Sequence, residues 1–524
     1  MTITAHIDRF AKDRLPSKET LPEFIFSDDV SEYPDELNAA EALLKNGYSD
    51  RPAIRMGTLL WTYDDLDQKS NNVAAALTND YGLVPGNRVL LRGNNKPMLA
   101  ALWFGVLKAG GVVVTTMTML RQKELDAIIG VSEPDIIIIE NDLPIDLIDS
   151  SKDKAEHVLS YNDITQKCEY LSGTFSVVKT ASDDVALLAF TSGTTGIPKA
   201  TVHFHRDILA MADGFAKHIL KPTCHDIFCG SPPLAFTFGL GGLLVFPARF
   251  GACVVYFDSG GPAVLLEQIE RHGVTTLFTA PTAYKGLIGI MNKSKISTLK
   301  TCVSAGENLP LSVSDDFYQA TGIRLIDGIG ATEMIHVFIS ASGDDIRPGA
   351  TGKVVPGYVA EIWDDDGKPL PDGEAGRLVV KGPTGCRYLN GDRQENYVEN
   401  GWNVTGDIFK RDKDGYFWFI ARGDDIIISA GYNIAAPEVE QAIMQHDAVS
   451  ECAVIGESDD DRGMIVKGFI VLKSGVKAND DLTKDIQQFV KNIAAPYKYP
   501  RAIEYIAALP KSATGKLLRK ELKS

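Results

Sequence analysis

The chain has 524 residues, of which 53 are lysine or arginine and 69 are aspartate or glutamate, so its formal net charge is −16. At roughly 100–200 residues per domain, this length predicts about three domains, or one large composite domain with a smaller one. Such an acidic surface argues against non-specific nucleic-acid binding, which depends on cationic side chains that neutralise phosphates. The seven cysteines are scattered without a CxxC pair, which favours reduced thiols over a disulfide framework or a zinc site.

The N-terminal region does not have the pattern of a targeting segment. Residues 1–16, MTITAHIDRFAKDRLP, carry charges throughout and lack the apolar core of a signal peptide. The longest apolar stretch, 238–257, is interrupted by Pro247 and Arg249 and falls short of a membrane span. The sequence therefore predicts a cytoplasmic protein that binds neither nucleic acid nor a membrane.

Short β-branched runs alternate with longer amphipathic segments over the first two thirds of the chain. Strands are predicted at 88–92 (RVLLR) and 111–115 (GVVVT), with a helix over 96–109 between them. Further strands are predicted at 135–140, 185–190, 252–257, 275–279 and 300–304. This alternation is typical of βα units, so we expect an α/β fold with largely buried parallel sheets.

Beyond Gly357 the pattern changes to short strands separated by DG and PDG turns, which indicate antiparallel hairpins. The strands predicted in this part cover 358–363, 376–381 and 416–420. After Asp424, helices are predicted at 437–446 and 480–493, with strands at 451–456, 467–472 and near Ile503. We therefore expect a large domain of βα sheets with a β-rich subdomain at residues 1–423, followed by a small α+β domain at 424–524.

A run of hydroxyls and glycines, TSGTTGIPK, follows the predicted strand that ends at Phe190. The candidate ligand residues in this run are Thr191, Ser192, Gly193, Thr194, Thr195, Gly196 and Lys199. Glycines let backbone N–H groups approach an anion, hydroxyls add donors, and the lysine supplies a point charge. The spacing is not that of a Walker A motif, and the following ATVHF is predicted as a strand. Alone, the run indicates either a phosphate loop or a Ser/Gly-rich surface loop.

The run resembles the nucleotide loop of the adenylate-forming superfamily, which includes acyl-CoA synthetases, luciferases and the adenylation domains of peptide synthetases. Further motifs of that superfamily follow in order: DGIGATEM at 327–334, GRLVVKG at 376–382, TGD at 405–407, ARGDD at 421–425 and PKSATGKLLRK at 510–520. Six motifs in one order are far more specific than any one of them. The resemblance implies that ATP activates a carboxylic acid as an acyl-adenylate, which then passes its acyl group to a thiol.

The resemblance also implies roles in a nucleotide site. Thr332 and Glu333 match the hydroxyl at the α-phosphate and the carboxylate linked to Mg²⁺, a cation that prefers oxygen ligands. Asp407 matches the residue that accepts both ribose hydroxyls, and Arg422 matches an arginine near the ribose and phosphates. The resemblance places Gly306 and Glu307 along the adenine and includes Asp327 and Gly328 among the nucleotide-binding residues. Without the other motifs, a helix cap or an ion pair would be favoured for Glu333 and a solvated surface charge for Arg422, and a turn would also explain Asp407.

Lys516 lies in the Gly/Ser/Thr-rich motif near the C-terminus. The resemblance places its ammonium between the substrate carboxylate and the α-phosphate during adenylation. For the thiol step it implies a mobile C-terminal domain that turns about Asp424 and brings the loop 428–433 (ISAGYN) to the site. There Ala430 and Gly431 would line the path of the pantetheine thiol. Isoleucines follow the DD pair where many relatives have a lysine, and this departure puts some contacts of the thioester-forming state in doubt.

The segment SPPLAFTFGLGGLLVFP at 231–247 matches the part of the superfamily that lies beside the acyl group. Together with DGIGATEMIHVF it resembles the aryl-CoA ligases, especially benzoate- and 2-aminobenzoate-CoA ligases. The flat acyl pocket implied by this resemblance consists of Phe236, Thr237, Phe238, Ile329, Gly330 and His336. The imidazole of His336 would form a hydrogen bond with a ring substituent. From composition alone, such aromatic residues belong more often to a core, and His336 is equally well explained as a core histidine.

Three functions remain open at this point. The first is an aryl-CoA ligase that uses ATP, Mg²⁺ and coenzyme A and acts on a small carboxylic acid. The second has the same chemistry, as a stand-alone adenylation enzyme that loads a carrier protein, or as a medium-chain or aliphatic acyl-CoA synthetase. The third is a catalytically silent nucleotide-binding regulator, against which the presence of Lys199, Glu333 and Lys516 together argues. Free coenzyme A is favoured because no carrier domain follows the last motif, and a homodimer stays open.

Overall fold

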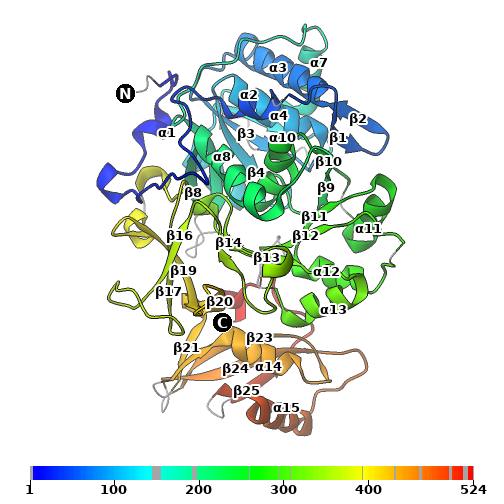
Figure 1. The fold of residues 1–524 in the computed structure, drawn as a ribbon, viewed down its shortest axis with the longest axis vertical. Coiled ribbons are helices and arrows are strands. Elements are labelled where there is room, and N and C mark those ends of the chain that lie inside the picture. Colours follow the sequence, from blue (N-terminus) through cyan, green and yellow to red (C-terminus); the bar gives the residue numbers. More distant parts are fainter. Residues whose placement is uncertain are drawn as a thin grey trace. The chain divides into compact units, whose positions relative to one another are not determined.

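The structure, a computed structural model, describes residues 4–45, 47–143, 155–191, 198–258, 260–292, 294–306, 309–391, 393–429, 432–459, 463–494, 498–511 and 517–522. The chain forms two compact units (Figure 1). The first contains Met1–Ala360 and Val380–Asn403, and the second contains Glu361–Val379 and Val404–Ser524. The predicted domain boundary at Asp424 does not coincide with the limits of these units, and the hinge predicted there stays a prediction.

A six-stranded sheet has the strand order β6-β5-β3-β4-β7-β8. Its strands are β3 (Arg88–Arg92), β4 (Val112–Thr116), β5 (Ile136–Ile139), β6 (His157–Ser160), β7 (Val185–Thr191) and β8 (Lys199–Phe204). All neighbours are parallel except β8, which is antiparallel to β7. Every residue of β3, β4 and β5 is buried. Because both faces of these strands are covered, their sequences are continuous apolar runs rather than alternating patterns.

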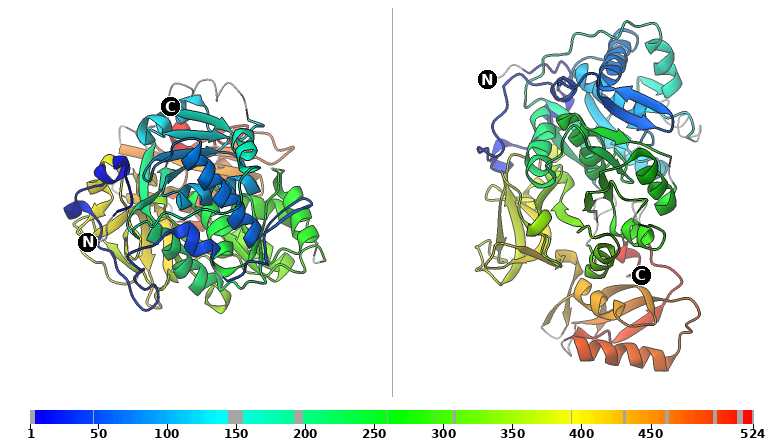
Figure 2. Two further views of the ribbon diagram at one scale, coloured as in Figure 1. Left: turned by 90° about the horizontal axis from the view of Figure 1, so that it is seen from above. Right: turned by 45° about the vertical axis from the view of Figure 1, so that its right-hand side comes forward.

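In the described part of the chain, seven helices occur between the N-terminus and β7, and one of them, α4 (Pro97–Lys108), packs on β3 and β4 of this sheet. The seven are α1 (Phe10–Asp13), η1 (Lys18–Thr20), α2 (Ala39–Leu44), α3 (Tyr63–Asn79), α4, α5 (Gln122–Ser132) and α7 (Tyr161–Cys168). Thr62 and Asp65 form a capping box at the start of α3, which satisfies two otherwise unpaired N–H groups. Figure 2 shows α3 beside α4. At Gly105 of α4 an added Cβ would lie 2.4 Å from Val73 of α3, so the glycine permits this close packing.

A second, nine-stranded sheet has the order β15-β14-β13-β12-β11-β9-β10-β1-β2. Its strands are β1 (Pro52–Met56), β2 (Leu59–Thr62), β9 (Ile227–Gly230), β10 (Cys253–Val255), β11 (Thr276–Thr279), β12 (Thr301–Ser304), β13 (Ile326–Gly330), β14 (Val337–Ser340) and β15 (Lys353–Val354). The strands from β1 to β13 in this order are parallel, whereas β2, β14 and β15 pair antiparallel. The carboxyl ends of β12 and β13 therefore lie side by side.

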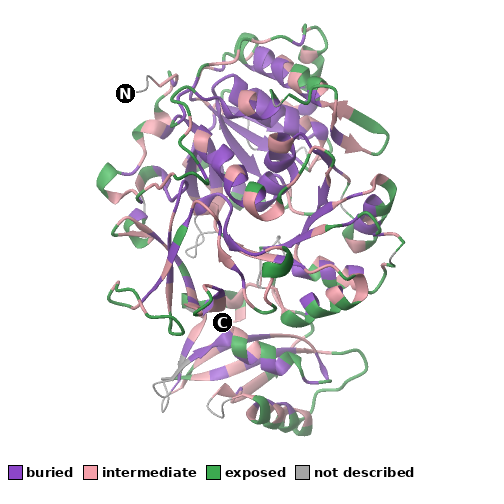
Figure 3. Cartoon of the chain, viewed as in Figure 1, coloured by how far each residue is buried: buried purple, intermediate pink, exposed green. Residues whose placement is uncertain are grey.

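The helices after β8 belong to the same unit. They are α8 (His205–Met211), the π-helix η2 (Ala212–Leu220), α9 (Thr237–Leu240), the π-helix η3 (Gly241–Val245), α10 (Phe246–Phe250), α11 (Gly261–His272), α12 (Pro281–Ile288), α13 (Leu311–Thr321), η4 (Thr332–Met334), η5 (Gly343–Asp345), η6 (Leu389–Gly391) and η7 (Gln394–Asn396). Strand β18 (Val398–Glu399) follows them. Figure 3 shows buried strands inside the unit and exposed helix faces outside. One core cluster joins Cys229, Leu277, Tyr284 and Phe317 beneath α11, α12 and α13.

The second unit contains a hairpin and a small α+β fold. Its elements, with those that cross its limits, are β16 (Val359–Trp363), β17 (Ala375–Lys381), β19 (Trp402–Arg411), β20 (Phe417–Arg422), η8 (Gly423–Asp425), β21 (Ile426–Ser429), β22 (Tyr432–Ala435), α14 (Ala436–Met444), β23 (Val449–Asp459), β24 (Gly463–Leu472), α15 (Asp480–Ile493), β25 (Ala502–Tyr505) and η10 (Arg519–Leu522). Strands β19 and β20 are antiparallel, as the DG turn predicts. Val439, Ile443, Ile470 and Ile486 belong to the core cluster of α14, β24 and α15.

The predicted α/β class is confirmed, and most predicted strands agree with the structure to within one or two residues. The sequence pattern of the segment 237–250 does not predict its structure. Three short helices follow one another there, and the middle one is a π-helix. The glycine pair and Pro247 in this segment conceal the helical periodicity. Among the described residues, no helix is both long enough and apolar enough to cross a membrane.

Gly230 is the last residue of β9 and comes just before the predicted acyl segment in the chain. A substitution there tests how closely β9 packs against β11. A Cβ at this position would lie 2.2 Å from the carbonyl oxygen of Phe278 on β11, and a backbone atom cannot yield. We expect Gly230→Ala to lower the free energy of unfolding by about 1–3 kcal/mol, measured by urea denaturation. The control is Gly130→Ala on α5, where nothing lies within 4 Å; this variant should gain about 0.5–1 kcal/mol. Equal midpoints for Gly230→Ala and the wild type would contradict the packing argument.

Candidate functional site

The predicted phosphate loop connects β7 to β8. Thr191 is the last residue of β7 and pairs with Lys199, the first residue of β8. Residues 192–196 lie outside the described residues, so the structure places the two ends of the predicted loop. Because the ladder pairs these two ends, the loop leaves and re-enters the sheet at one point, and the backbone of Lys199 is held by strand hydrogen bonds.

Tyr388 links two charged side chains: Lys199, which the resemblance assigns to the phosphates, and Glu333, which it assigns to Mg²⁺. The Lys199 ammonium lies 4.9 Å from the centroid of the Tyr388 ring. The Tyr388 hydroxyl donates a hydrogen bond to Oε1 of Glu333 at 2.5 Å. Burial and the Glu333 carboxylate raise the pKa of Tyr388, so the phenol keeps its proton and acts as the donor. Lys199, Tyr388 and Glu333 are thus brought together from three segments.

A buried ion pair holds the segment that carries Tyr388. Arg387 donates from Nη1 to Oδ2 of Asp207 on α8 at 2.6 Å, and both side chains are almost fully buried. The guanidinium lies 4.0 Å from the ring centroid of Phe204 and 4.3 Å from that of Phe24. Loss of one partner from such a pair leaves an uncompensated buried charge, which costs about 3–5 kcal/mol. The pair therefore fixes this segment against the core.

The same segment lies along β8. The N–H of Val202 donates to the carbonyl of Arg387 at 2.7 Å, and Thr201 and Tyr388 form an isolated antiparallel bridge. The side-chain carbonyl of Gln394 accepts the N–H of Tyr388 at 2.9 Å. These contacts determine the position of the Tyr388 ring, since they fix the backbone on both sides of it.

His203, also on β8, lies beneath the turn that carries Glu333. Burial lowers the pKa of His203 to about 4, although a hydrogen bond with the backbone of Thr332 opposes the shift. The imidazole is therefore neutral near pH 7 and contacts the first residue of η4 without adding charge. The hydroxyl of Thr201 lies 3.2 Å from its Nε2. Strand β8 thus contacts the short helix η4 that carries Glu333, and Tyr388 contacts the Glu333 carboxylate itself.

Glu333 is the candidate magnesium ligand. The described residues contain no cluster of three or more His, Cys, Asp or Glu that could hold a metal ion. Mg²⁺ is commonly bound by one or two carboxylates together with substrate phosphates, so a single carboxylate fits this cation. Tyr388 occupies Oε1 of Glu333, and no hydrogen bond from the described part of the chain reaches Oε2. That oxygen is suited to a cation that also contacts the nucleotide.

The predicted adenine residues follow two neighbouring strands. Ser304 of β12 pairs with Asp327 of β13, so Gly306 and Gly328 lie near one edge of the sheet. Gly306 has φ +95°, a left-handed angle that glycine adopts without strain. Glu307 lies outside the described residues. The structure therefore juxtaposes both predicted segments, while the contact of either with a nucleotide stays a prediction.

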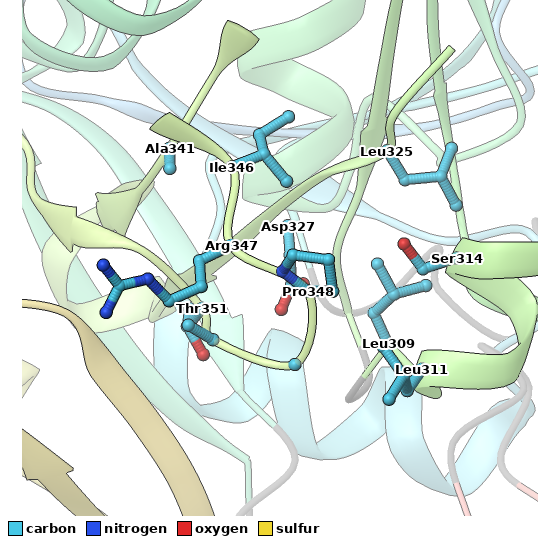
Figure 4. A pocket seen from close by; sticks show the side chains of 12 residues that line it. Leu309, Leu311, Ser314, Leu325, Asp327, Ala341, Ile346, Arg347, Pro348 and Thr351 are labelled. Atoms are coloured by element: carbon cyan, nitrogen blue, oxygen red, sulfur yellow. The ribbon is translucent and has the colours of Figure 1, made fainter. Parts of the chain in front are cut away.

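A small cavity lies beside Asp327, as Figure 4 shows. Its volume is about 30 Å³, and Leu309, Leu325 and Thr351 are among its lining residues. This volume admits water but not a purine ring. Burial raises the pKa of Asp327 to about 7, although the N–H of Gly328 opposes the shift. The carboxyl group of Asp327 therefore titrates near physiological pH.

Aromatic rings surround His336 in the predicted acyl region. The ring centroids of Phe246, Phe215 and Phe238 lie 4.7, 5.3 and 6.0 Å from that of His336. His336 is 3% exposed, and neither ring nitrogen has a hydrogen-bond partner among the described residues. Burial lowers the pKa of His336 to about 3, although a weaker interaction with the backbone of Phe238 opposes the shift, so the imidazole is neutral. A buried polar group without a partner is unusual and indicates a place for a ligand group.

Glycines allow this cluster to form. A Cβ at Gly241 of η3 would lie 2.5 Å from Cδ2 of His336, and one at Gly330 of β13 would lie 2.6 Å from its carbonyl oxygen. Ile335, just before His336, is buried and has φ +62°, which β-branched residues rarely adopt. Such strain persists where the surrounding packing enforces it. The backbone around His336 is therefore constrained from several sides.

The remaining predicted pocket residues lie on the same elements. Phe236 is the N-cap of α9 and half-buried, Thr237 begins that helix and is buried, and Ile329 is half-buried on β13. The structure thus brings Phe238 and Gly330 against His336, while Phe215 and Phe246 complete the ring cluster. These two phenylalanines are not among the residues predicted from the sequence. Phe246 lies in the quoted segment, but Phe215 belongs to η2 and has no motif around it.

The predicted ribose residues lie in the second unit. Asp407 on β19 is 8% exposed and pairs with Arg422 of β20 across the hairpin. Nη1 of Arg422 lies 3.7 Å from Oδ1 of Asp407. The N–H of Asp407 donates to the hydroxyl of Thr405 at 3.2 Å, which fixes the turn at Gly406. The structure therefore brings these two predicted residues together.

The predicted hinge and catalytic lysine belong to the same unit. Asp424 is part of the short helix η8, while Ala430, Gly431 and Lys516 lie outside the described residues. Lys511 and Leu517 form an isolated antiparallel bridge, so the two ends of the segment that contains Lys516 lie side by side. The assignments of Lys516, Ala430 and Gly431 stay predictions.

Arg519 anchors the end of that segment. Its Nη2 donates to both carboxylate oxygens of Glu440 on α14 at 2.7 Å, and its Nη1 lies 3.1 Å from Asp425. Burial raises the pKa of Glu440, although Arg519 opposes the shift. One guanidinium thus connects the C-terminal segment with α14 and with the residue beside the predicted hinge.

Comparisons with known proteins match most of the chain. The family model described as AMP-binding enzyme matches residues 42–388, and the model described as AMP-binding enzyme C-terminal domain matches residues 438–516. A benzoate–CoA ligase of Thauera aromatica is 34% identical over 478 residues, which cover 88% of this chain and 90% of that protein. The mitochondrial acyl-coenzyme A synthetase ACSM3 of Mus musculus is 32% identical over 491 residues, with 89% and 84% covered. The crystal structure of the anthranilate CoA ligase AuaEII in complex with anthranoyl-AMP matches with a TM-score of 0.88 and 32% identity, covering 94% of this chain and 97% of that one.

The buried His336 predicts a specific response to acid. Its pKa is about 3 in the folded chain against 6.5 for an ordinary histidine, so the unfolded chain binds an extra proton between these values. Stability contributed by the neutral imidazole is complete above the ordinary pKa and is lost as the pH falls. Between about pH 6 and pH 4, the free energy of unfolding of the wild type should fall as the pH falls. In His336→Leu this fall should be smaller than in the wild type by about 1 kcal/mol per pH unit. Phe246→Leu alters the same cluster without removing a titrating group and should keep the wild-type slope. Identical slopes for all three proteins would contradict burial of a neutral imidazole.

Proposed function

Because the chain belongs to the AMP-binding enzyme family, we propose that it is an ATP-dependent acid–thiol ligase for small aromatic carboxylic acids, with coenzyme A as the thiol. Relatives named benzoate–CoA ligase and acyl-coenzyme A synthetase support the acyl-CoA ligase activity. The observation that carries the aromatic substrate is the ring cluster around His336, whose buried imidazole has two nitrogens without partners among the described residues.

In the first half-reaction, the substrate carboxylate attacks the α-phosphorus of ATP, a new O–P bond forms, and pyrophosphate leaves. Two anions must approach each other, so catalysis consists largely of positioning and charge neutralisation. The ammonium of Lys199 holds the outer phosphates, and Thr332 donates its hydroxyl to the α-phosphate. Oε2 of Glu333 would hold Mg²⁺, which supplies positive charge to the phosphates when bound.

Separate residues are assigned to the base and to the ribose of the nucleotide. Gly306 and Asp327 lie along the edge where the adenine binds. Asp407 accepts the ribose hydroxyls, and charge-assisted hydrogen bonds of this kind contribute about 1.5–3 kcal/mol each. Arg422 lies across the hairpin from Asp407 and contributes positive charge near the ribose and phosphates.

The acyl pocket favours an aromatic acid with a polar ring substituent. Neutral imidazole has one N–H donor and one acceptor nitrogen, so His336 can satisfy an amino or hydroxyl group on the ring. The faces of Phe238 and Phe246 would pack against the ring itself. The relationship to ACSM3 supports a medium-chain acid as the second candidate. An aliphatic chain would leave both nitrogens of His336 buried and unpaired, at a cost of about 1–3 kcal/mol.

In the second half-reaction, the thiolate of coenzyme A attacks the acyl carbonyl, a C–S bond forms, and AMP leaves. Lys516 acts in the first half-reaction, between the carboxylate and the α-phosphate. The small domain then turns about Asp424 and brings the loop with Ala430 and Gly431 to the site, where the absence of a side chain at Gly431 lets the thiol pass. The bridge between Lys511 and Leu517, and the contacts of Arg519 with Glu440 and Asp425, hold the ends of the segment that contains Lys516.

The substrate proposal is tested with benzoate, 2-aminobenzoate, 2-hydroxybenzoate and hexanoate, each assayed with ATP and coenzyme A. We expect kcat/KM for 2-aminobenzoate or 2-hydroxybenzoate to exceed that for hexanoate by at least about tenfold, since the ring substituent pairs with His336. The wild type should also prefer these substituted acids over unsubstituted benzoate. His336→Leu should lose the preference over benzoate, whereas His336→Gln, which keeps a donor and an acceptor, should retain part of it.

Other outcomes of that assay would redirect the assignment. A higher kcat/KM for hexanoate than for any aromatic acid would identify an aliphatic acyl-CoA synthetase. Formation of acyl-AMP without a CoA thioester would identify a carrier-loading enzyme. Binding of ATP without conversion of any acid would leave only a nucleotide-binding regulator.

The two half-reactions are separable by substitution in the second unit. Lys516→Ala should abolish adenylation but largely spare thioester formation from a supplied acyl-adenylate, because its ammonium acts only on the first pair of anions. Gly431→Leu should block the thiol path and spare adenylation. Each variant is assayed by pyrophosphate release and, separately, by consumption of acyl-adenylate with coenzyme A. Equal loss of both half-reactions in Lys516→Ala, or normal thioester formation in Gly431→Leu, would refute the two-state assignment.

A further inference from the structure

Tyr388 contacts both Lys199, which is assigned to the phosphates of ATP, and Glu333, which is assigned to Mg²⁺. Its hydroxyl meets the carboxylate of Glu333, and its ring face meets the ammonium of Lys199. We propose that Tyr388 is a positioning residue for the phosphate site, which orients Glu333 through its hydroxyl and places the Lys199 ammonium through its ring. The proposal rests on the proposed function, because Glu333 and Lys199 take their roles from it.

The hydroxyl contact restricts Glu333. A distance of 2.5 Å between Oη and Oε1 is that of a charge-assisted hydrogen bond between a hydroxyl and a carboxylate. Glu333 is only half-buried, so its side chain would otherwise sample several rotamers. With Oε1 engaged by Tyr388, the other oxygen is held in one direction. A cation that bridges Glu333 and the nucleotide thus meets a preorganised ligand.

The ring contact restricts Lys199. An ammonium 4.9 Å from a ring centroid lies within the range in which the negative face of the ring attracts it. Lysine has a long flexible side chain, and the strand hydrogen bonds of β8 fix only its backbone. The ring of Tyr397 packs edge-on against that of Tyr388, with centroids 6.0 Å apart at 79°. The platform under the ammonium is therefore itself held in place.

If Tyr388 only stabilised the fold, its hydroxyl group would not be needed. The adjacent Arg387 already anchors the segment through Asp207, and the backbone of Tyr388 is fixed by Gln394. Phenylalanine at position 388 would keep the ring packing and both of these anchors. The hydroxyl is thus separable from the fold. The buried Cys386 thiol is a second, weaker neighbour of this hydroxyl, so its loss should be felt chiefly at Glu333.

The role of the hydroxyl in orienting Glu333 is tested with Tyr388→Phe. Mn²⁺ is titrated into the full-length enzyme that holds a non-hydrolysable ATP analogue, and bound Mn²⁺ is followed by electron paramagnetic resonance. We expect the Kd of Mn²⁺ to rise about tenfold, because a hydrogen bond to a charged group is lost. Tyr397→Phe, which removes a hydroxyl from the neighbouring ring, is the matched control and should keep the wild-type Kd. An unchanged Kd in Tyr388→Phe would overturn the proposal.

The ring arm is tested with Tyr388→Leu, compared with Tyr388→Phe. The affinity for inorganic pyrophosphate, measured without a divalent cation, should fall about two- to fivefold further in the leucine variant, since the cation–π contact is lost. In a Lys199→Met background this difference should vanish. A difference that persists there would show that the ring acts through something other than Lys199 and would overturn this arm.

A double-mutant cycle separates positioning from general packing. If Tyr388 acts through Glu333, then Tyr388→Phe should have no further effect on Mn²⁺ affinity in a Glu333→Gln background. Additive effects would overturn the proposal. The proposed function is judged independently, by the dependence of ATP turnover on an acid in the wild type. An acid-independent wild type would remove that function, while normal acid activation with an unchanged Mn²⁺ affinity in Tyr388→Phe would remove only the role of Tyr388.

Discussion

The buried ion pair between Arg387 and Asp207 is the constraint on which the geometry of the first unit depends. Two charges that are almost fully removed from water must stay together, because separation would leave either of them uncompensated. The pair holds a short segment against β8, and Tyr388 is the next residue of that segment. From this position its hydroxyl reaches Glu333 and its ring reaches Lys199. A contact within the core thereby determines the arrangement of the charged groups at the candidate phosphate site.

A protein with a formal net charge of −16 must supply cations locally if it is to bind ATP and a carboxylate together. Lys199 lies in the first unit, whereas Arg422 and Lys516 belong to the second. The acyl cluster around His336 contains no ionised group in its immediate ring contacts, since burial keeps the imidazole neutral. In the proposed function, charge is thus concentrated on the nucleotide, and the acid would be recognised by ring packing and a neutral hydrogen-bonding group. This division suits an enzyme that neutralises phosphates and selects acids in separate places.

Much of the fold could be predicted from the sequence because buried parallel strands such as β3, β4 and β5 are unbroken apolar runs. Glu333 and Lys199 could be singled out because each lies in a short motif with a specific spacing. Arg387 and Tyr388 could not, because their partners come from distant parts of the chain: Asp207 lies 180 positions from Arg387. Phe215 could not be predicted either, because its contact with His336 also joins distant segments. The π-helical turns around the acyl segment have no sequence pattern that distinguishes them from a glycine-rich loop. Local patterns thus locate the motifs, but tertiary contacts decide which side chains support them.

The most direct test of acyl adenylation is exchange of labelled pyrophosphate into ATP in the absence of coenzyme A. The account predicts exchange that requires an added aromatic acid and proceeds without the thiol, because the acyl-adenylate forms before the thiol acts. Exchange that is independent of any acid, or that appears only when coenzyme A is present, would contradict it.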